Sequence, residues 1–167
     1  IVISPSGIAA AKYLKQKFGT PYEVFCPPEI IPEWKERKEQ LEHSEQIEAN
    51  IAIPNRKERS DKKVLIIHQQ VLANTLREEL LAFAMEQNIQ TECAKITVAS
   101  WFMLDDALKK EGDILFKEED DWISYIKENE YDLIIADPLL KKAVPFYKGE
   151  WYDLPHFAIS GKKRQTV

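Results

Sequence analysis

The sequence predicts an α/β protein built on a Rossmann-like parallel sheet with helices on both faces, a three-layer α/β/α arrangement. Short apolar runs alternate with amphipathic helical segments, a pattern typical of parallel strands joined by right-handed helical crossovers. The chain has 167 residues, 44% of them hydrophobic, and can therefore bury one proper core. A long polar stretch separates two βα halves, so we expect a long connecting helix between them.

The first half, residues 1–31, is predicted to be a βαβ unit. Its helix is expected from Gly7 to Phe18, because apolar residues recur there at helical spacing, and Gly19 stops it. Short apolar runs on either side of this helix predict two strands, at residues 1–3 and 22–25.

The connection is predicted to span residues 32–62. Between residues 33 and 50 the chain is dense in Glu, Lys, Arg and Gln, which favours a long and mostly solvated helix. Pro32 suits the first turn of such a helix. Residues 51–62 carry Pro54 and several charges and are predicted to be a linker.

The second half, residues 63–167, repeats the alternation of strands and helices. Strands are expected at residues 64–67, 93–98, 133–136 and 157–159. Helices are expected at residues 71–86, 100–108, 120–129 and 139–144.

Composition excludes several classes of partner. The 23 basic and 28 acidic residues give a net charge of -5, which disfavours binding to nucleic acids or anionic membranes. No apolar run approaches the roughly 20 residues that cross a bilayer. Cys26 and Cys93 show neither zinc-ligand spacing nor a disulfide framework, so we expect a cytoplasmic protein. The sequence opens at Ile1 inside a strand-like run, and we interpret it as a piece of a longer polypeptide.

Ligands of an open parallel sheet bind outside the carboxyl ends of its strands, where helix N-termini present amides. The candidate catalytic residues, as proton donors or orienting groups, are His68 and Asp137 at the ends of predicted strands and a third titratable residue, His156. The candidate cofactor-binding residues there are Ser4, Ser6, Gly7, Gln69, Ser100 and Ser160. Cys26 is the candidate metal ligand.

Each candidate also has a structural interpretation. The turn at Ser4–Gly7 lacks the glycine spacing of a dinucleotide fingerprint and the ending of a P-loop, which favours a simple turn with a helix cap. Asp137 before a proline suits a helix cap. His68 and His156 suit hydrogen-bonded structural histidines, and Cys26 suits a small apolar filler. No catalytic triad or pair of catalytic carboxylates can be named from the sequence.

Three stretches, in their order and spacing, carry a family resemblance. They are KFGTPY at residues 17–22 with Pro27-Pro28 after it, KVLII at 63–67 with LREEL at 76–80, and YDLII at 131–135 with Lys141-Lys142 and VPF at 144–146. Together they resemble the component-1 proteins of nitrogenase and its relatives, which include the dark-operative protochlorophyllide reductase subunits and the cofactor-assembly scaffolds. The chain would correspond to a late portion of such a subunit.

The resemblance implies stacked Rossmann-like domains, a second component-1 subunit as partner, and electrons from an ATP-dependent iron-sulfur reductase. It also implies an iron-sulfur or metal cluster in the full assembly. In the molybdenum-iron protein a cysteine and a histidine bind the cluster, and the corresponding places here are Ile3 or Ser4 and residues 148–153. These supply neither thiolate nor imidazole, although His156 lies a few residues beyond the second place.

We therefore expect an oxidoreductase domain that forms part of a pocket for a substrate or cofactor, such as a tetrapyrrole, without the usual cluster ligands. On this hypothesis the isolated domain is inactive. Two alternatives stay open: a non-catalytic scaffold or metal-binding module of the same architecture, and a general α/β domain that binds a small molecule.

Overall fold

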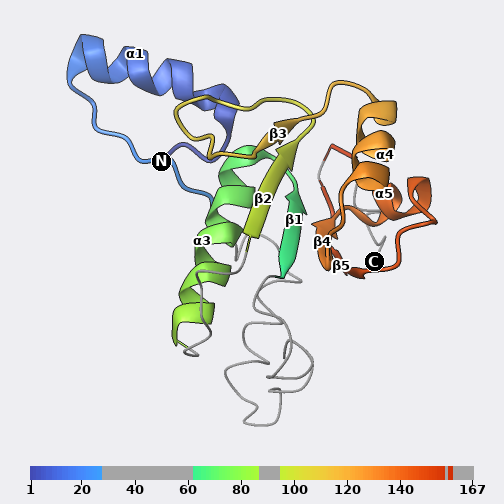
Figure 1. Ribbon diagram of the computed structural model, residues 1–167. Coiled ribbons are helices and arrows are strands. Elements are labelled where there is room, and N and C mark those ends of the chain that lie inside the picture. The colour runs from blue at the N-terminus through green and yellow to red at the C-terminus, as the bar shows by residue number, and fades with distance from the viewer. Residues whose placement is uncertain (28–61, 87–94, 157, 160–167) are drawn as a thin grey trace, which may run out of the picture.

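A computed structural model describes residues 1–27, 62–86, 95–156 and 158–159, with the side chains of residues 83–86 excepted (Figure 1). The long helix expected at residues 33–50 lies outside the described residues, as does nearly all of the predicted linker. Ser160 and Cys93 lie outside them as well.

The core of the structure is a five-stranded parallel sheet, which confirms the general α/β class. The strands are β1 (Lys63–Ile67), β2 (Lys95–Ser100), β3 (Ile114–Leu115), β4 (Leu133–Ala136) and β5 (Glu150–Asp153). Their order across the sheet is β3-β2-β1-β4-β5. Strands β2 and β3 therefore lie on one side of β1, and strands β4 and β5 lie on the other.

The central strands are mainly apolar because both faces of the sheet are covered. On β1, Ile66 aligns with Val98 of β2 and with Ile135 of β4, and all three side chains are at most 2% exposed. They face helix α3 (Gln70–Glu86), whose Val71, Leu72 and Leu76 complete this side of the core.

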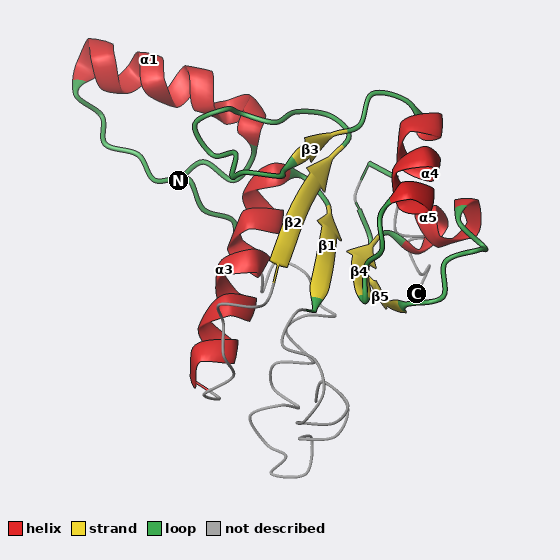
Figure 2. Ribbon diagram, viewed as in Figure 1, coloured by secondary structure: helices red, strands yellow, loops and turns green. Residues whose placement is uncertain are grey.

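The opposite face of the sheet carries helices α4 (Glu119–Glu128) and α5 (Pro138–Ala143) (Figure 2). Leu65 and Ile67 of β1 point to this side and pack in a cluster with the fully buried Trp122 of α4. Alternation along β1 thus sends successive side chains into two separate cores. Helices cover the sheet on both faces.

The N-terminal segment contains a short 3-10 turn, Pro5–Gly7, and helix α1 (Ile8–Phe18). The two strands expected around this helix are reduced to one parallel bridge between Val2 and Val24. Gly7 suits its place because a Cβ there would lie only 3.1 Å from Cγ1 of Val2. Gly19 ends α1 with φ 71°, a left-handed conformation that glycine adopts at low cost.

Two expectations for the second half are wrong. The helix expected at residues 100–108 is absent: β2 runs on to Ser100, and a loop leads from there to β3, which the sequence analysis missed. The side chain of Gln70 holds this loop, donating to the Asp105 carbonyl at 3.0 Å and accepting from the Asp105 amide at 2.7 Å. The backbone of Asp105 thus bonds to the side chain of Gln70, 35 positions earlier in the chain.

The last strand is also misplaced in the sequence prediction. It lies at Glu150–Asp153, and residues 158–159 form a turn instead. β5 is an edge strand whose residues are exposed or half-buried, so it lacks the continuous apolar run that marks the central strands. Within the described ranges, no helix has the length and apolarity that crossing a membrane requires.

Candidate functional site

The three predicted catalytic residues lie together at the carboxyl edge of the sheet. His68 follows β1, Asp137 follows β4, and His156 lies three residues beyond β5. Since β1 and β4 are the neighbours where the strand order reverses, this is the position at which open α/β sheets bind ligands. The ring centroids of the two histidines are 4.4 Å apart, with the ring planes inclined at 45°. All three residues are at most 3% exposed.

Asp137 acts as a positioning residue. Its Oδ1 accepts a hydrogen bond from the Leu139 amide at 2.8 Å, which caps α5 as the sequence suggested. Its Oδ2 accepts from the His156 amide at 2.7 Å. The carboxylate therefore joins the start of α5 to the segment after β5 and holds the His156 backbone beside β4.

Hydrogen bonds indicate which ring nitrogen carries the hydrogen in each neutral imidazole. Nδ1 of His156 accepts from the Ala158 amide at 3.1 Å, so the proton of the neutral ring is on Nε2. Nε2 of His68 lies 3.5 Å from the Pro155 carbonyl oxygen, a long contact in which only the nitrogen can donate. Nε2 therefore carries the proton in both rings.

The surroundings keep both imidazoles neutral at pH 7. Burial, and after it the adjacent His156, lower the pKa of His68 from 6.5 to about 3, against the opposing effects of the Pro155 carbonyl and the Asp137 carboxylate. Burial also lowers the pKa of His156, again against the effect of Asp137. A neutral imidazole can accept a proton on one nitrogen and release one from the other, so the pair suits proton relay better than anion binding.

The predicted cofactor-binding residues border the same edge but make structural contacts. Gln69 donates to the Ile3 carbonyl and accepts from the Val71 amide, both at 3.0 Å, and so ties the N-terminal segment to the start of α3. Ser100 is buried at the end of β2, and its carbonyl oxygen accepts from the Phe116 amide at 2.9 Å. Ser160 lies outside the described residues.

Ser4, Ser6 and Gly7 lie before α1, one to four residues beyond Ile3. The hydroxyls of Ser4 and Ser6 are 3.0 Å apart, and neither the 3-10 turn nor α1 has a side-chain cap. The serine cap that the sequence suggested is therefore wrong. A role for these residues in binding a cofactor stays a prediction.

Cys26, the predicted metal ligand, is buried in the apolar cluster of α3 and is 4% exposed. Burial raises the pKa of its thiol and so disfavours the thiolate that binds metals. Across residues 1–27, 62–86 and 95–156, no three His, Cys, Asp or Glu side chains gather as a metal site. This environment agrees better with the apolar-filler interpretation, and metal binding by Cys26 stays a prediction.

Phe102 is a site residue that the sequence analysis missed. It is 59% exposed, and its ring centroid lies 5.5 Å from that of His156. It stands in the loop after β2, so this loop brings an exposed ring against the buried histidine. No periodicity in the sequence could have identified it, because the loop was taken for a helix.

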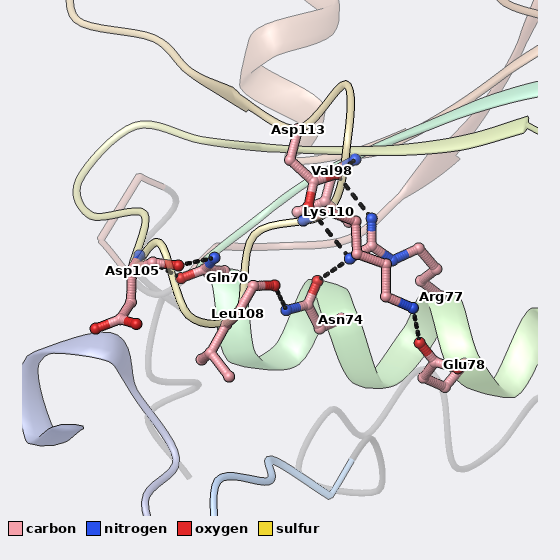
Figure 3. Close-up of polar contacts among 9 residues, drawn as sticks. All are labelled: Gln70, Asn74, Arg77, Glu78, Val98, Asp105, Leu108, Lys110 and Asp113. Atoms are coloured by element: carbon pink, nitrogen blue, oxygen red, sulfur yellow. Dashed lines mark hydrogen bonds and ion pairs between the residues drawn. The ribbon is translucent and has the colours of Figure 1, made fainter. Parts of the chain in front are cut away.

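A second buried polar cluster joins α3 to the loop before β3 (Figure 3). Arg77 donates to both carboxylate oxygens of Asp113, at 2.7 and 3.2 Å, and both side chains are at most 3% exposed. Asp113 also accepts from the Val98 amide at 3.0 Å and from the Lys110 amide at 2.8 Å. This charged cluster is structural, because its contacts join helix α3, strand β2 and the loop before β3.

A cavity of about 400 Å³ lies between α3 and the segment around Val24. It is lined by Val24, Phe25, Val71, Asn74, Thr75, Glu78, Glu79, Ala82 and Leu108. None of the predicted site residues is among them, so the cavity is separate from the histidine pair.

Comparisons with protein-family models, with curated proteins and with solved structures found no match.

Proposed function

We propose that this chain is part of a nitrogenase-like component-1 oxidoreductase subunit and forms one wall of a pocket for a substrate or cofactor. The observation that carries the proposal is the pair of neutral imidazoles, His68 and His156, beside Asp137 at the strand-order reversal. The order β3-β2-β1-β4-β5 supports the Rossmann-like part of the proposal, because doubly wound dinucleotide folds use the same order. The resemblance of the three sequence stretches supports the family.

The histidine pair has the properties that reduction of an organic group requires of a protein. Adding two electrons to an unsaturated group also consumes two protons, and these must reach a site from which bulk water is excluded. The two tilted rings place four ring nitrogens in one buried site, and Asp137 holds the His156 backbone in place through its amide. A reducible ligand such as a tetrapyrrole would approach past Phe102, the exposed ring against His156.

The residues of this chain do not fit a nitrogenase-type cluster. Ile3 and Ser4 stand where a cysteine would be needed, and the described residues contain no group of three metal-binding side chains. Electrons would therefore come from clusters held elsewhere in the assembly. A second component-1 subunit and an ATP-dependent iron-sulfur reductase are the partners that this proposal requires.

The test uses the protein isolated without oxygen together with its native partners. We expect bound iron, and ATP-dependent reduction of the native chromophore or substrate, followed by absorbance. Replacing His156→Gln should slow reduction by about 100-fold or more, since a positioned proton-transfer group contributes roughly that much. The matched control is Lys127→Gln on the exposed face of α4. Absence of iron both before and after reconstitution would refute the proposal.

A non-catalytic scaffold or binding module is the second candidate, and the burial of the site favours it. His68, Asp137 and His156 are all at most 3% exposed, as expected for groups that hold a structure together. The two candidates differ in turnover. A scaffold would release its cargo chemically unchanged, and His156→Gln would alter cargo affinity or stability without a reaction rate to change.

A further inference from the structure

Aromatic rings form a continuous series through the core on the α4 side of the sheet. The series begins at Trp101, one residue before Phe102, and the ring centroid of Trp101 lies 5.3 Å from that of Phe116. The centroid of Phe116 lies 5.7 Å from that of Tyr125, which lies 6.1 Å from that of Tyr131. Ring contacts therefore join the loop beside the histidine pair to the end of helix α4.

A branch of the same series runs to the edge strand β5. Phe116 packs edge-on against Trp122 with the centroids 6.0 Å apart, and Trp122 packs against Trp151 at 6.4 Å. Tyr147 ends the branch, 6.2 Å from Trp151. The hydroxyl of Tyr147 donates to two backbone carbonyl oxygens, at 3.2 and 3.1 Å. Carbonyl oxygens are too weakly basic to take up this proton, so the branch does not favour a tyrosyl radical at its end.

The tryptophans of the series lack a partner for their indole protons. Among the residues that the structure describes, no acceptor lies within hydrogen-bond distance of Nε1 of Trp101, Trp122 or Trp151, and all three nitrogens are buried. Most buried donors in native folds are paired, so three unpaired indoles in one series are unusual. An oxidised indole is a radical cation that becomes neutral by losing its Nε1 proton. Without an acceptor the cation persists, and it can take an electron from a neighbouring ring.

The tyrosine pair at the other end of the series has the partners that the indoles lack. The hydroxyl oxygens of Tyr125 and Tyr131 are 2.5 Å apart, and either can donate to the other. Both side chains are half-buried, so the pair lies at the boundary between core and solvent. Burial, and after it Tyr131, raise the pKa of Tyr125, so this phenol keeps its proton until it is oxidised. The proton can then leave through Tyr131 to water.

We propose that this aromatic series transfers an oxidising equivalent from Trp101 to the Tyr125–Tyr131 pair. A one-electron oxidant, such as an oxygen-derived radical, takes one electron from Trp101 and leaves the indole radical cation. Tyr125 returns that electron through Phe116 and loses its hydroxyl proton to water through Tyr131, which leaves one neutral tyrosyl radical. A thiol then restores the phenol by giving up a hydrogen atom and becomes a thiyl radical.

This transfer protects the buried histidine pair from oxidation. The exposed ring of Phe102 lies against His156, so an oxidant meets the site at the loop that also contains Trp101. Electron return to Trp101 moves the radical away from this loop to the end of α4. The inference rests on the ring contacts and the hydroxyl pair, and it is independent of the proposed reduction.

The test places a photo-oxidant at the Trp101 end of the purified chain. Met103 is 48% exposed, and Met103→Cys together with Cys93→Ser gives one accessible thiol for a ruthenium polypyridyl label, because Cys26 is buried. Flash oxidation of the label should produce a tyrosyl radical, identified by its electron paramagnetic resonance spectrum. Deuterated water should slow its formation, since a proton leaves with the electron. A tryptophan radical without a tyrosyl signal would refute the proposal.

Variants that keep every ring locate the transfer. Tyr125→Phe with Tyr131→Phe should abolish the tyrosyl signal and leave a tryptophan radical, and Trp101→Phe should abolish the tyrosyl signal by removing the first station. Circular dichroism should stay unchanged, because each phenylalanine retains the packing of an aromatic ring. Tyr13→Phe is the matched control, since Tyr13 is 54% exposed on α1, and it should retain the full signal. A tyrosyl signal that survives either the double variant or Trp101→Phe would overturn the assignment.

Discussion

Two buried polar clusters of similar size differ in charge and in place. Arg77 and Asp113 form an ion pair in which both carboxylate oxygens accept from the guanidinium and from backbone amides. His68 and His156 instead form a neutral pair, and Asp137 accepts a hydrogen bond from the backbone amide of His156. The first cluster lies between α3 and a loop, and the second lies at the carboxyl ends of the strands.

The difference separates a structural cluster from a candidate site. Both carboxylate oxygens of the ion pair are occupied by the guanidinium and by backbone amides, so this cluster holds elements together. The imidazoles can gain and lose protons, and they stand where open α/β sheets bind ligands. Burial is common to both clusters and is therefore not the property that distinguishes them.

The largest effect is expected for Asp113→Ala. This change leaves the Arg77 guanidinium buried without its counter-charge, and we expect a loss of about 3 to 5 kcal/mol in the free energy of unfolding. Urea denaturation followed by circular dichroism measures it. Replacing Arg77→Met together with Asp113→Leu should cost much less, since no charge stays buried. If the double variant lost as much free energy of unfolding as Asp113→Ala, the cluster would stabilise the fold through its packing and not through its charges.

Asp137→Ala should have the next largest effect. The change removes the cap of α5 and leaves the His156 amide without its acceptor, which together cost about 2 to 4 kcal/mol. In NMR spectra the ring resonances of both histidines should also shift, because the His156 backbone loses its anchor. Unchanged His68 and His156 resonances would contradict the positioning role.

Acid should weaken the fold through the histidine pair. The folded pKa of His68, about 3, lies below the ordinary value of 6.5, so the unfolded chain binds the proton first. Stability is therefore complete above pH 6.5 and falls as the pH drops toward 3, by about 2 kcal/mol between pH 6 and pH 4. His68→Gln should flatten this dependence in urea titrations at each pH. The same slope in wild type and variant would show that other groups cause the acid sensitivity.

The smallest effect is expected for the exposed ion pair that borders the charged cluster. Lys110 and Glu78 bind each other, but their side chains are 51% and 61% exposed. Glu78→Gln should therefore change the free energy of unfolding by less than about 1 kcal/mol. The effect should shrink further in 0.5 M salt, because screening weakens exposed pairs. A loss as large as that of Asp113→Ala would mean that the pair is part of the buried network.

The sequence predicted the central elements because their signals are local. The continuous apolar runs of β1 and β4 and the helical spacing of α3 and α4 identified these elements to within one or two residues. The carboxyl-end rule then selected His68 and Asp137 as candidates, because the rule needs only the ends of the strands. His156 was added only as a further titratable residue, since it precedes the strand expected at residues 157–159.

The sequence by itself thus determined the α/β class, the central strands and the candidate residues at their ends. Only the tertiary structure decided the strand order, the edge strands β3 and β5, and the contact between His68 and His156, which are 88 positions apart by their numbers. The physical reason is that edge strands and loops depend on distant partners: Gln70 holds the loop that was expected to be a helix, and Asp137 places His156. Apolar periodicity reports burial along one segment, and it carries no information about which segments meet.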